Sequence, residues 1–194
     1  MSKIQVVISE SISELIYDIE NVTHITGRSA DQGTNPEQVA NMQANGDESE
    51  LNQMLRSIGN AFSYIKTKMS EYLSDTGTTA NNGLLEATTP EPNTGADKDT
   101  KPYLDPHGVA TSDMTLAKQI DNVLKITLSM PPNYNQSAND SISNSVHQYM
   151  VNRSLGDWYK ETFPNNAKAY YHLSMQNIVE IREAVSKRVR PTRV

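Results

Sequence analysis

Residues 137–193 read SANDSISNSVHQYMVNRSLGDWYKETFPNNAKAYYHLSMQNIVEIREAVSKRVRPTR, and this stretch decides the fold. Two helix-forming segments flank a short Phe-Pro-Asn-Asn sequence at 163–166. Proline interrupts a helix, and asparagine is a favoured residue at the start of the next one. The pattern therefore predicts helices over about 139–162 and 166–188. Because the connection is so short, the two helices must be antiparallel neighbours.

Aromatic side chains are concentrated around this turn. Six of the twelve aromatic residues lie between Tyr149 and Tyr171, and they include the only tryptophan, Trp158. We expect Trp158, Tyr159 and Tyr171 to lock the two helices together. Gly156 lowers helix propensity by about 1 kcal/mol, which indicates that another helix or a bulky ring approaches closely there. The apolar side chains expected to point inward from the second helix are Tyr171, Leu173, Met175, Ile178, Ile181 and Val185.

The quoted stretch ends in a cluster of basic residues. Residues 182–193 carry a net charge of +4, so the rest of the chain carries −10 of the total of −6. An acidic body with a basic end can direct one subunit onto the acidic face of its neighbour. Basic residues near the end of a helix can also simply complement the helix dipole. The candidate interface residues are Arg182, Lys187, Arg188, Arg190 and Arg193.

A second strong helical signal covers residues 51–72. Its apolar residues recur at spacings of 4, 3, 4, 3, 4 and 3, and they are Leu51, Leu55, Ile58, Phe62, Ile65, Met69 and Tyr72. This heptad pattern is typical of the core face of a helix in a bundle, and also of a coiled-coil contact between subunits. We favour the core face and keep the contact between subunits as the alternative.

The remaining segments predict a helix and two strands. Apolar residues alternate over 3–8, helical spacing follows over about 11–25, and a second alternating stretch covers 123–130. Residues 84–88, 103–104 and 3–8 are all possible partners for the strand at 123–130, because a lone strand is not stable.

Residues 74–110 are polar and hold four of the nine prolines and four of the nine glycines, which favours a long loop. The predicted fold is mainly α: an antiparallel bundle of about four helices, with a small β-hairpin or strand excursion and this long polar loop. It forms a single domain over 1–194, with a helical core at about 9–73 and 138–190 and the excursion at 74–137.

No pattern of chemically active residues predicts an enzyme. The chain has no cysteine, and its four histidines do not show the helical spacing of a metal site; they are His24, His107, His147 and His172. The sequence contains neither a Gly-x-Ser-x-Gly motif nor a glycine-rich phosphate loop. We therefore expect no catalytic, metal or cofactor site and no small-molecule substrate. The acidic body argues against nucleic acid as a partner, and no apolar stretch is long enough for a membrane span.

The C-terminal third resembles a known class of proteins. The residues that carry the resemblance are VHQYMVN at 146–152, GDWY at 156–159, Ala167 with Tyr170 and Tyr171, and Ile181-Arg182 with RVRPTR at 188–193. This pattern is similar to small helical virion and assembly proteins of tailed phages and prophages, such as head–tail connector (adaptor) proteins. The long polar stretch at 74–110 has no place in the usual pattern of those proteins.

The resemblance implies a role in assembly. It implies a ring of identical subunits beneath a phage portal, with other copies, portal or tail proteins as partners. The protein would then be assembled in the bacterial cytoplasm and located in the virion, and Arg188, Arg190 and Arg193 would reach the neighbour or the portal. The alternative is a cytosolic helical interaction module that dimerises through the residues of the 51–72 heptad pattern.

Overall fold

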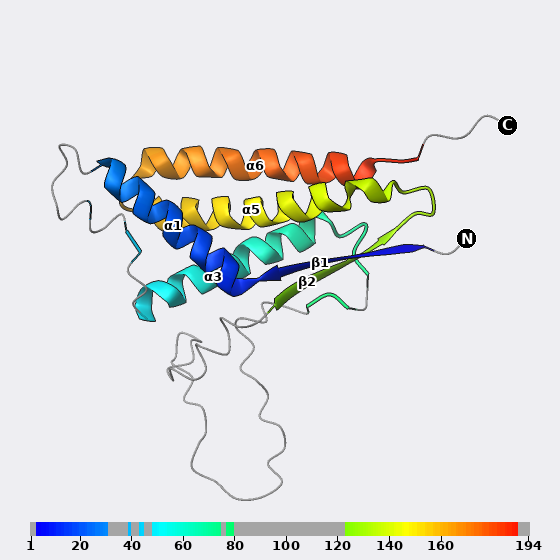
Figure 1. Cartoon of the computed structure of the whole chain (residues 1–194), viewed down its shortest axis with the longest axis horizontal. Helices are drawn as coiled ribbons and strands as arrows, with labels where there is room; N and C mark the ends of the chain where they lie inside the picture. Colours follow the sequence, from blue (N-terminus) through cyan, green and yellow to red (C-terminus); the bar gives the residue numbers. More distant parts are fainter. Residues whose placement is uncertain are drawn as a thin grey trace, which may run out of the picture.

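The computed structural model describes residues 3–30, 39, 43–44, 48–74, 77–79 and 123–189 of the 194-residue chain. Within these ranges the protein is mainly helical with a small antiparallel sheet, as the sequence predicts. The elements are β1 (Ile4–Ser11), α1 (Ile12–Ala30), α3 (Glu48–Lys68), β2 (Val123–Met130), the 3-10 helix η1 (Gln136–Ala138), α5 (Asn139–Tyr159) and α6 (Pro164–Ser186). Figure 1 shows α6, α5 and α3 one below another, with α1 crossing them and the strands beside α3.

The sheet joins the N-terminal segment to the middle of the chain. β1 and β2 pair in antiparallel register, from Ile4 opposite Met130 to Ser11 opposite Val123. Three segments were possible partners for the strand at 123–130. Within the described residues, its partner is the N-terminal segment, which the sequence predicted at 3–8. One face of the sheet joins the core through Val6, Ile8, Leu124, Ile126, Leu128 and Met130. Because its strands are so distant in sequence, this pair is not a hairpin.

The second edge of β2 is covered by the chain that follows α3. The backbone N–H of Ser74 donates to the carbonyl of Thr127 at 2.8 Å, and that of Ser129 donates to the carbonyl of Tyr72 at 2.6 Å. Gly77 has a φ of +82°, and a Cβ there would lie 2.9 Å from Oγ1 of Thr127. Glycine is therefore needed at position 77 both for its backbone conformation and for its lack of a side chain.

The heptad pattern of residues 51–72 faces the core of the same chain, although α3 ends at Lys68, before Met69 and Tyr72. Ile58, Phe62 and Ile65 are fully buried, and Leu55 and Met69 are each only 3% exposed. α3 packs against α5 along this face. Five of the seven residues that the alternative assigned to a contact between subunits are thus already buried within one chain, and the other two, Leu51 and Tyr72, are partly buried.

α1 follows β1 without a break and is longer than the sequence predicts. Its core side carries Ile12, Leu15 and Ile19, none of which is exposed. The helix continues to Ala30, past Gly27 and five residues beyond the end expected at about residue 25. At position 27 a Cβ would lie 2.6 Å from Cγ of Gln43, so this glycine allows close approach instead of ending the helix.

Candidate functional site

The α5–α6 hairpin is held at its closed end by stacked aromatic rings. Pro164 is the first residue of α6, where the missing N–H of proline has no cost because helix starts leave that group unpaired. Tyr159 is fully buried at the end of α5. Its ring stacks on Tyr170, with centroids 5.7 Å apart, and meets Phe163 edge-on at 6.4 Å. These contacts fix the angle at which the chain reverses.

A second contact in the hairpin depends on a missing side chain. The ring of Tyr171 lies over Gly156, where a Cβ would be only 2.6 Å from ring atoms Cδ1 and Cε1. The expectation that a bulky ring approaches Gly156 is therefore confirmed. The guanidinium of Arg153 covers the same ring, 4.7 Å from its centroid. Gly156 thus allows α5 and α6 to approach with an aromatic ring between them.

Asp157 connects three helices through its two carboxylate oxygens. The hydroxyl of Tyr171 donates to Oδ1 at 2.7 Å, and the hydroxyl of Ser57 on α3 donates to Oδ2 at 2.6 Å. Burial, followed by the hydrogen bond to Asp157, raises the pKa of Tyr171 to about 12. The tyrosine therefore stays a neutral donor over the whole physiological pH range, and the ring over Gly156 is held in place.

The aromatic residues chosen from the sequence do not all contribute equally. Tyr159 and Tyr171 lie in the hairpin contact, whereas Trp158 is half-buried and packs at the edge of the core. Tyr170 and Asp157 were not among the residues that we expected to lock the hairpin, although Tyr170 stacks on Tyr159 and Asp157 accepts a hydrogen bond from Tyr171. The sequence could have indicated Tyr170, since it stands beside Tyr171 in an aromatic pair. The helical period alone, however, does not show which of these two neighbouring rings stacks on Tyr159.

The basic residues at the end of α6 lie in different environments. Arg182 is exposed on the helix. Nη1 of Arg188 donates to the carbonyls of Val185 at 2.8 Å and Lys187 at 3.1 Å. Helix ends leave such carbonyls unpaired, so this arginine caps its own helix. Arg190 and Arg193 lie outside the described residues, and their role at an interface stays a prediction.

The chain after α6 is attached to the loop before η1. The backbone N–H of Val189 donates to the carbonyl of Asn133 at 2.9 Å, and that of Asn135 donates to the carbonyl of Lys187 at 3.2 Å. Lys187 itself is exposed. Residues 187–189 therefore leave the helix in a fixed direction.

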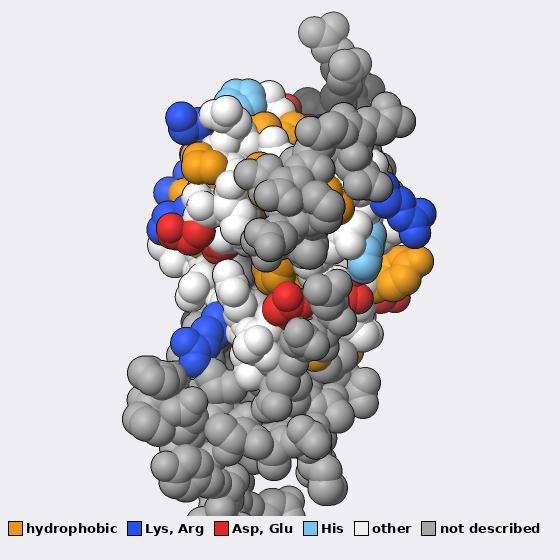
Figure 2. All heavy atoms as spheres, turned by 90° about the vertical axis from the view of Figure 1, so that its left-hand side faces the viewer, with side chains coloured by type: hydrophobic (Ala, Val, Ile, Leu, Met, Phe, Trp, Pro, Cys, Tyr) orange, Lys and Arg blue, Asp and Glu red, His pale blue; other side chains and the backbone are white. Residues whose placement is uncertain are grey.

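α6 is an outer helix that exposes large apolar side chains. It packs along α5 and makes few contacts with any other element. Leu173, Met175 and Val179 are 43%, 51% and 53% exposed. The prediction that Leu173 and Met175 point inward is wrong, because Ser174 between them faces the core and each neighbour is turned about 100° away from it. Seen from the end of the molecule, hydrophobic side chains appear at the surface among charged ones (Figure 2).

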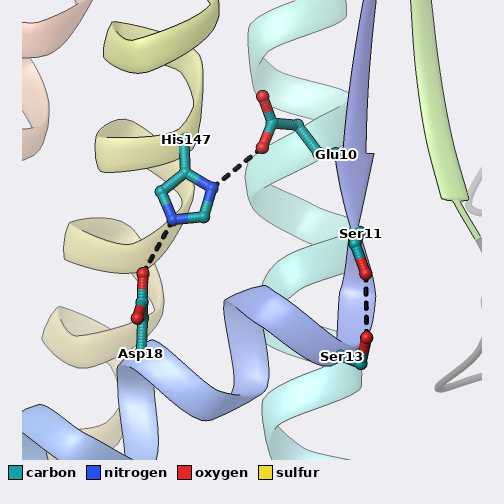
Figure 3. Close-up of polar contacts among 5 residues, drawn as sticks. All are labelled: Glu10, Ser11, Ser13, Asp18 and His147. Carbon is teal, nitrogen blue, oxygen red and sulfur yellow. Dashed lines mark hydrogen bonds and ion pairs between the residues drawn. The ribbon is translucent and has the colours of Figure 1, made fainter.

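A histidine links α5 to both N-terminal elements (Figure 3). Nδ1 of His147 lies 2.9 Å from Oε2 of Glu10 on β1, and Nε2 lies 2.9 Å from Oδ2 of Asp18 on α1. Since carboxylates only accept hydrogen bonds, both ring nitrogens donate and the ring is an imidazolium. The hydrogen bond to Glu10 is the main cause that raises the pKa of His147 to about 9, and Asp18 adds to it against the opposing effect of burial.

This contact makes stability depend on pH. A histidine whose pKa rises on folding stabilises the protein fully below its unfolded pKa of about 6.5, and that stabilisation is lost as the pH rises to its folded pKa. We expect the free energy of unfolding to fall by about 2–3 kcal/mol between pH 6.5 and about 9.5, less than the full shift implies because Asp18 is partly exposed to solvent. Urea unfolding at a series of pH values measures this change.

Two variants define the cause of that pH dependence. His147→Gln should be less stable at pH 6.5 and should show little change up to pH 9.5. His172→Gln, which alters an exposed histidine on α6, should keep the pH dependence of the wild type. A wild-type chain with equal stability at both pH values would contradict the assignment of an imidazolium.

The other histidines show no comparable cluster in the described residues. His24 and His172 lie on α1 and α6, and His107 is outside the described ranges. In those ranges no group of three or more His, Asp or Glu side chains is placed to hold a metal ion. None of the helices that the structure describes is long and apolar enough to span a membrane. No protein-family model, curated protein or solved structure matches this chain.

Proposed function

We propose that this chain is a non-enzymatic structural subunit that assembles with copies of itself or docks onto another protein through its helical faces. The observation that carries this proposal is the outer helix α6, which exposes Met175 and Val179 on one side and Leu173 on the other. Exposed apolar side chains that lie together, as Met175 and Val179 do one helical turn apart, are typical of protein interaction surfaces.

The setting that we propose is the particle of a tailed phage or prophage, in a role like that of a head–tail connector. The sequence resemblance of the C-terminal third supports this setting, as does a bundle of helices that ends in a basic segment. Other copies, portal or tail proteins are the proposed partners, and the virion is the proposed location. We propose no small-molecule substrate, nucleic acid or membrane as a partner.

The alternative, a cytosolic module that dimerises through the 51–72 pattern, finds less support. Ile58, Phe62 and Ile65 are fully buried by their own chain. A dimer formed through these residues would first have to open the contact between α3 and α5. An assembly through outer helices has no such cost.

Removing residues 190–194 tests the role of the basic end. The deletion takes away Arg190 and Arg193 and keeps the contacts of residues 187–189 with the loop at 133–135. We expect the wild type to show a mass that rises with concentration, and the shortened chain to stay monomeric with an unchanged melting temperature. Light scattering after gel filtration measures the mass, and circular dichroism measures the melting.

A matched control removes two positive charges elsewhere. Lys3 and Lys160 are both exposed, so Lys3→Ser with Lys160→Ser lowers the net charge equally without touching the basic end. This control should assemble like the wild type. A shortened chain that assembles as well as the wild type would overturn the role of the basic end.

A further inference from the structure

The two edges of the sheet differ in what covers them. β2 has β1 on one side, and the chain that follows α3 bonds to its other side. β1 has β2 as its only neighbouring strand in the described part of the chain. Among the described residues, no backbone hydrogen bond reaches the other edge of β1. The unpaired N–H and C=O groups of such an edge are a template for a further strand.

The register of the sheet identifies the residues of β1 that direct these groups outward. Thr127 and Ser129 of β2 bond through their backbone to the chain after α3, away from β1. Their partners across the sheet are Val7 and Gln5. The two residues of an antiparallel pair direct their backbone groups either toward each other or both away, and the two kinds of pair alternate. Gln5, Val7 and Ser9 therefore direct their N–H and C=O groups to the open edge.

This edge lacks the features that usually keep sheet edges apart. Those features are charged side chains, proline, bulges and very short strands. β1 is eight residues long, pairs without a bulge and contains no proline. The side chains of Gln5, Val7 and Ser9 are uncharged and exposed, and Val7 is 58% exposed. The open edge is therefore suited to pairing with an extended segment.

A second copy of β1 fits this edge in one antiparallel register. With Val7 opposite Val7 of the second copy, Gln5 lies opposite Ser9 and Ser9 lies opposite Gln5, so apolar meets apolar and polar meets polar. A shift by two residues would set Val7 opposite Gln5 or Ser9 instead. A parallel pair in register would place Lys3 beside Lys3 and Glu10 beside Glu10. Like charges directly opposite are destabilising, so the charges favour the antiparallel pair.

We infer that the β1 strands of two copies pair edge to edge, antiparallel and centred on Val7, so that two sheets join into one. Lys3 then lies opposite Ser11 of the second copy, and no two like charges are directly opposite. The contact is isologous, because both copies use the same surface. It goes beyond the proposed function, which rests on helical faces and the basic end. So few strand pairs bury far less than the roughly 1,200 Å² of a stable interface, so the pairing is weak alone and adds to assembly through other faces.

Disulfide trapping detects this pairing even when it is weak, because the chain has no cysteine of its own. In the inferred register the two Cα atoms at position 7 lie about 5.5 Å apart, a separation that a disulfide spans. Under mild oxidation, Val7→Cys should therefore form a covalent dimer at least about tenfold faster than Gln53→Cys, because pairing holds its two thiols at a high effective concentration. Gln53 is exposed on α3 and is the matched control. Non-reducing gel electrophoresis measures both rates.

Two neighbouring positions test the register. Gln5→Cys alone and Ser9→Cys alone should cross-link no faster than Gln53→Cys, since identical positions would lie more than about 13 Å apart, four residues along the strand. When the two variants are mixed, they should form a disulfide with each other, because position 5 of one copy lies opposite position 9 of the other. Rapid cross-linking of Gln5→Cys with itself would indicate parallel pairing and would contradict the inference.

The outcomes separate this inference from the proposed function. If Val7→Cys cross-links no faster than Gln53→Cys, the pairing of two copies is wrong, even where light scattering shows that the wild type assembles. The open edge would then fit an extended segment of another protein instead. If Val7→Cys cross-links rapidly and the chain without residues 190–194 still assembles like the wild type, the pairing stands and the role of the basic end fails.

Discussion

Replacing Phe62 with alanine should lower the free energy of unfolding by about 3–5 kcal/mol, the usual cost of removing a fully buried phenylalanine. Phe62 lies in the middle of the core face of α3 and is not exposed at all. The deleted ring leaves a cavity between α3 and the body of the protein, since the surrounding side chains can only partly relax. Urea unfolding, monitored by circular dichroism, measures the loss.

The same variant distinguishes a core from a contact between subunits. Because the cavity is inside one chain, the loss should be independent of protein concentration, and the oligomeric state should not change. Gln53→Ala, at an exposed position of the same helix, should change stability by no more than about 0.5 kcal/mol. If Phe62→Ala instead yielded a stable monomer from a dimer, the heptad pattern would be a subunit contact after all.

Replacing Gly156 with valine should lower the free energy of unfolding by about 3 kcal/mol or more, since overpacking costs up to about 3 kcal/mol and a lost buried hydrogen bond adds about 1–3. The new Cβ would lie 2.6 Å from the ring of Tyr171. That ring cannot move aside without losing its hydrogen bond to Asp157. The hairpin therefore has to open, and thermal unfolding should show the loss.

A double variant and a second glycine check this explanation. In the background of Tyr171→Ala, Gly156→Val should lower the free energy of unfolding much less, because the ring with which the new side chain clashes has been removed. Gly27→Ala should be neutral or stabilising by up to about 1 kcal/mol, since the side chain of Gln43 that it meets is flexible. If Gly156→Val lowered the free energy of unfolding equally in both backgrounds, a clash with Tyr171 would not be the cause of the loss.

The regular elements of this protein could be predicted because their periods are strong. The alternation at 123–130 gives β2 with its exact bounds, and the heptad pattern gives the buried side of α3. The partner of β2 stayed open, because three segments were possible partners and pairing is decided by packing. The helix at 164–186 began two residues earlier than predicted, since Pro164 starts it instead of only ending the previous one.

The errors occurred where a polar residue takes a core position. Ser174 is buried on the inner side of α6, and Leu173 and Met175 were wrongly assigned inward because hydrophobicity was used to define the face.

The contacts of His147 had no local signal, since Glu10 and Asp18 are 137 and 129 positions away in the sequence. Such long-range polar contacts follow from the tertiary fold, which no periodicity encodes.

The pairing of β1 with β2 has a consequence for how the chain folds. Its paired residues are 112 to 126 positions apart, from Ser11 with Val123 to Ile4 with Met130. On the ribosome, β1 is synthesised before β2, so it cannot pair until more than a hundred further residues have been added. Contacts this distant form slowly, whereas the neighbouring α5 and α6 meet early. Pulse-labelled hydrogen exchange during refolding should therefore protect the amides of that hairpin before those of β1.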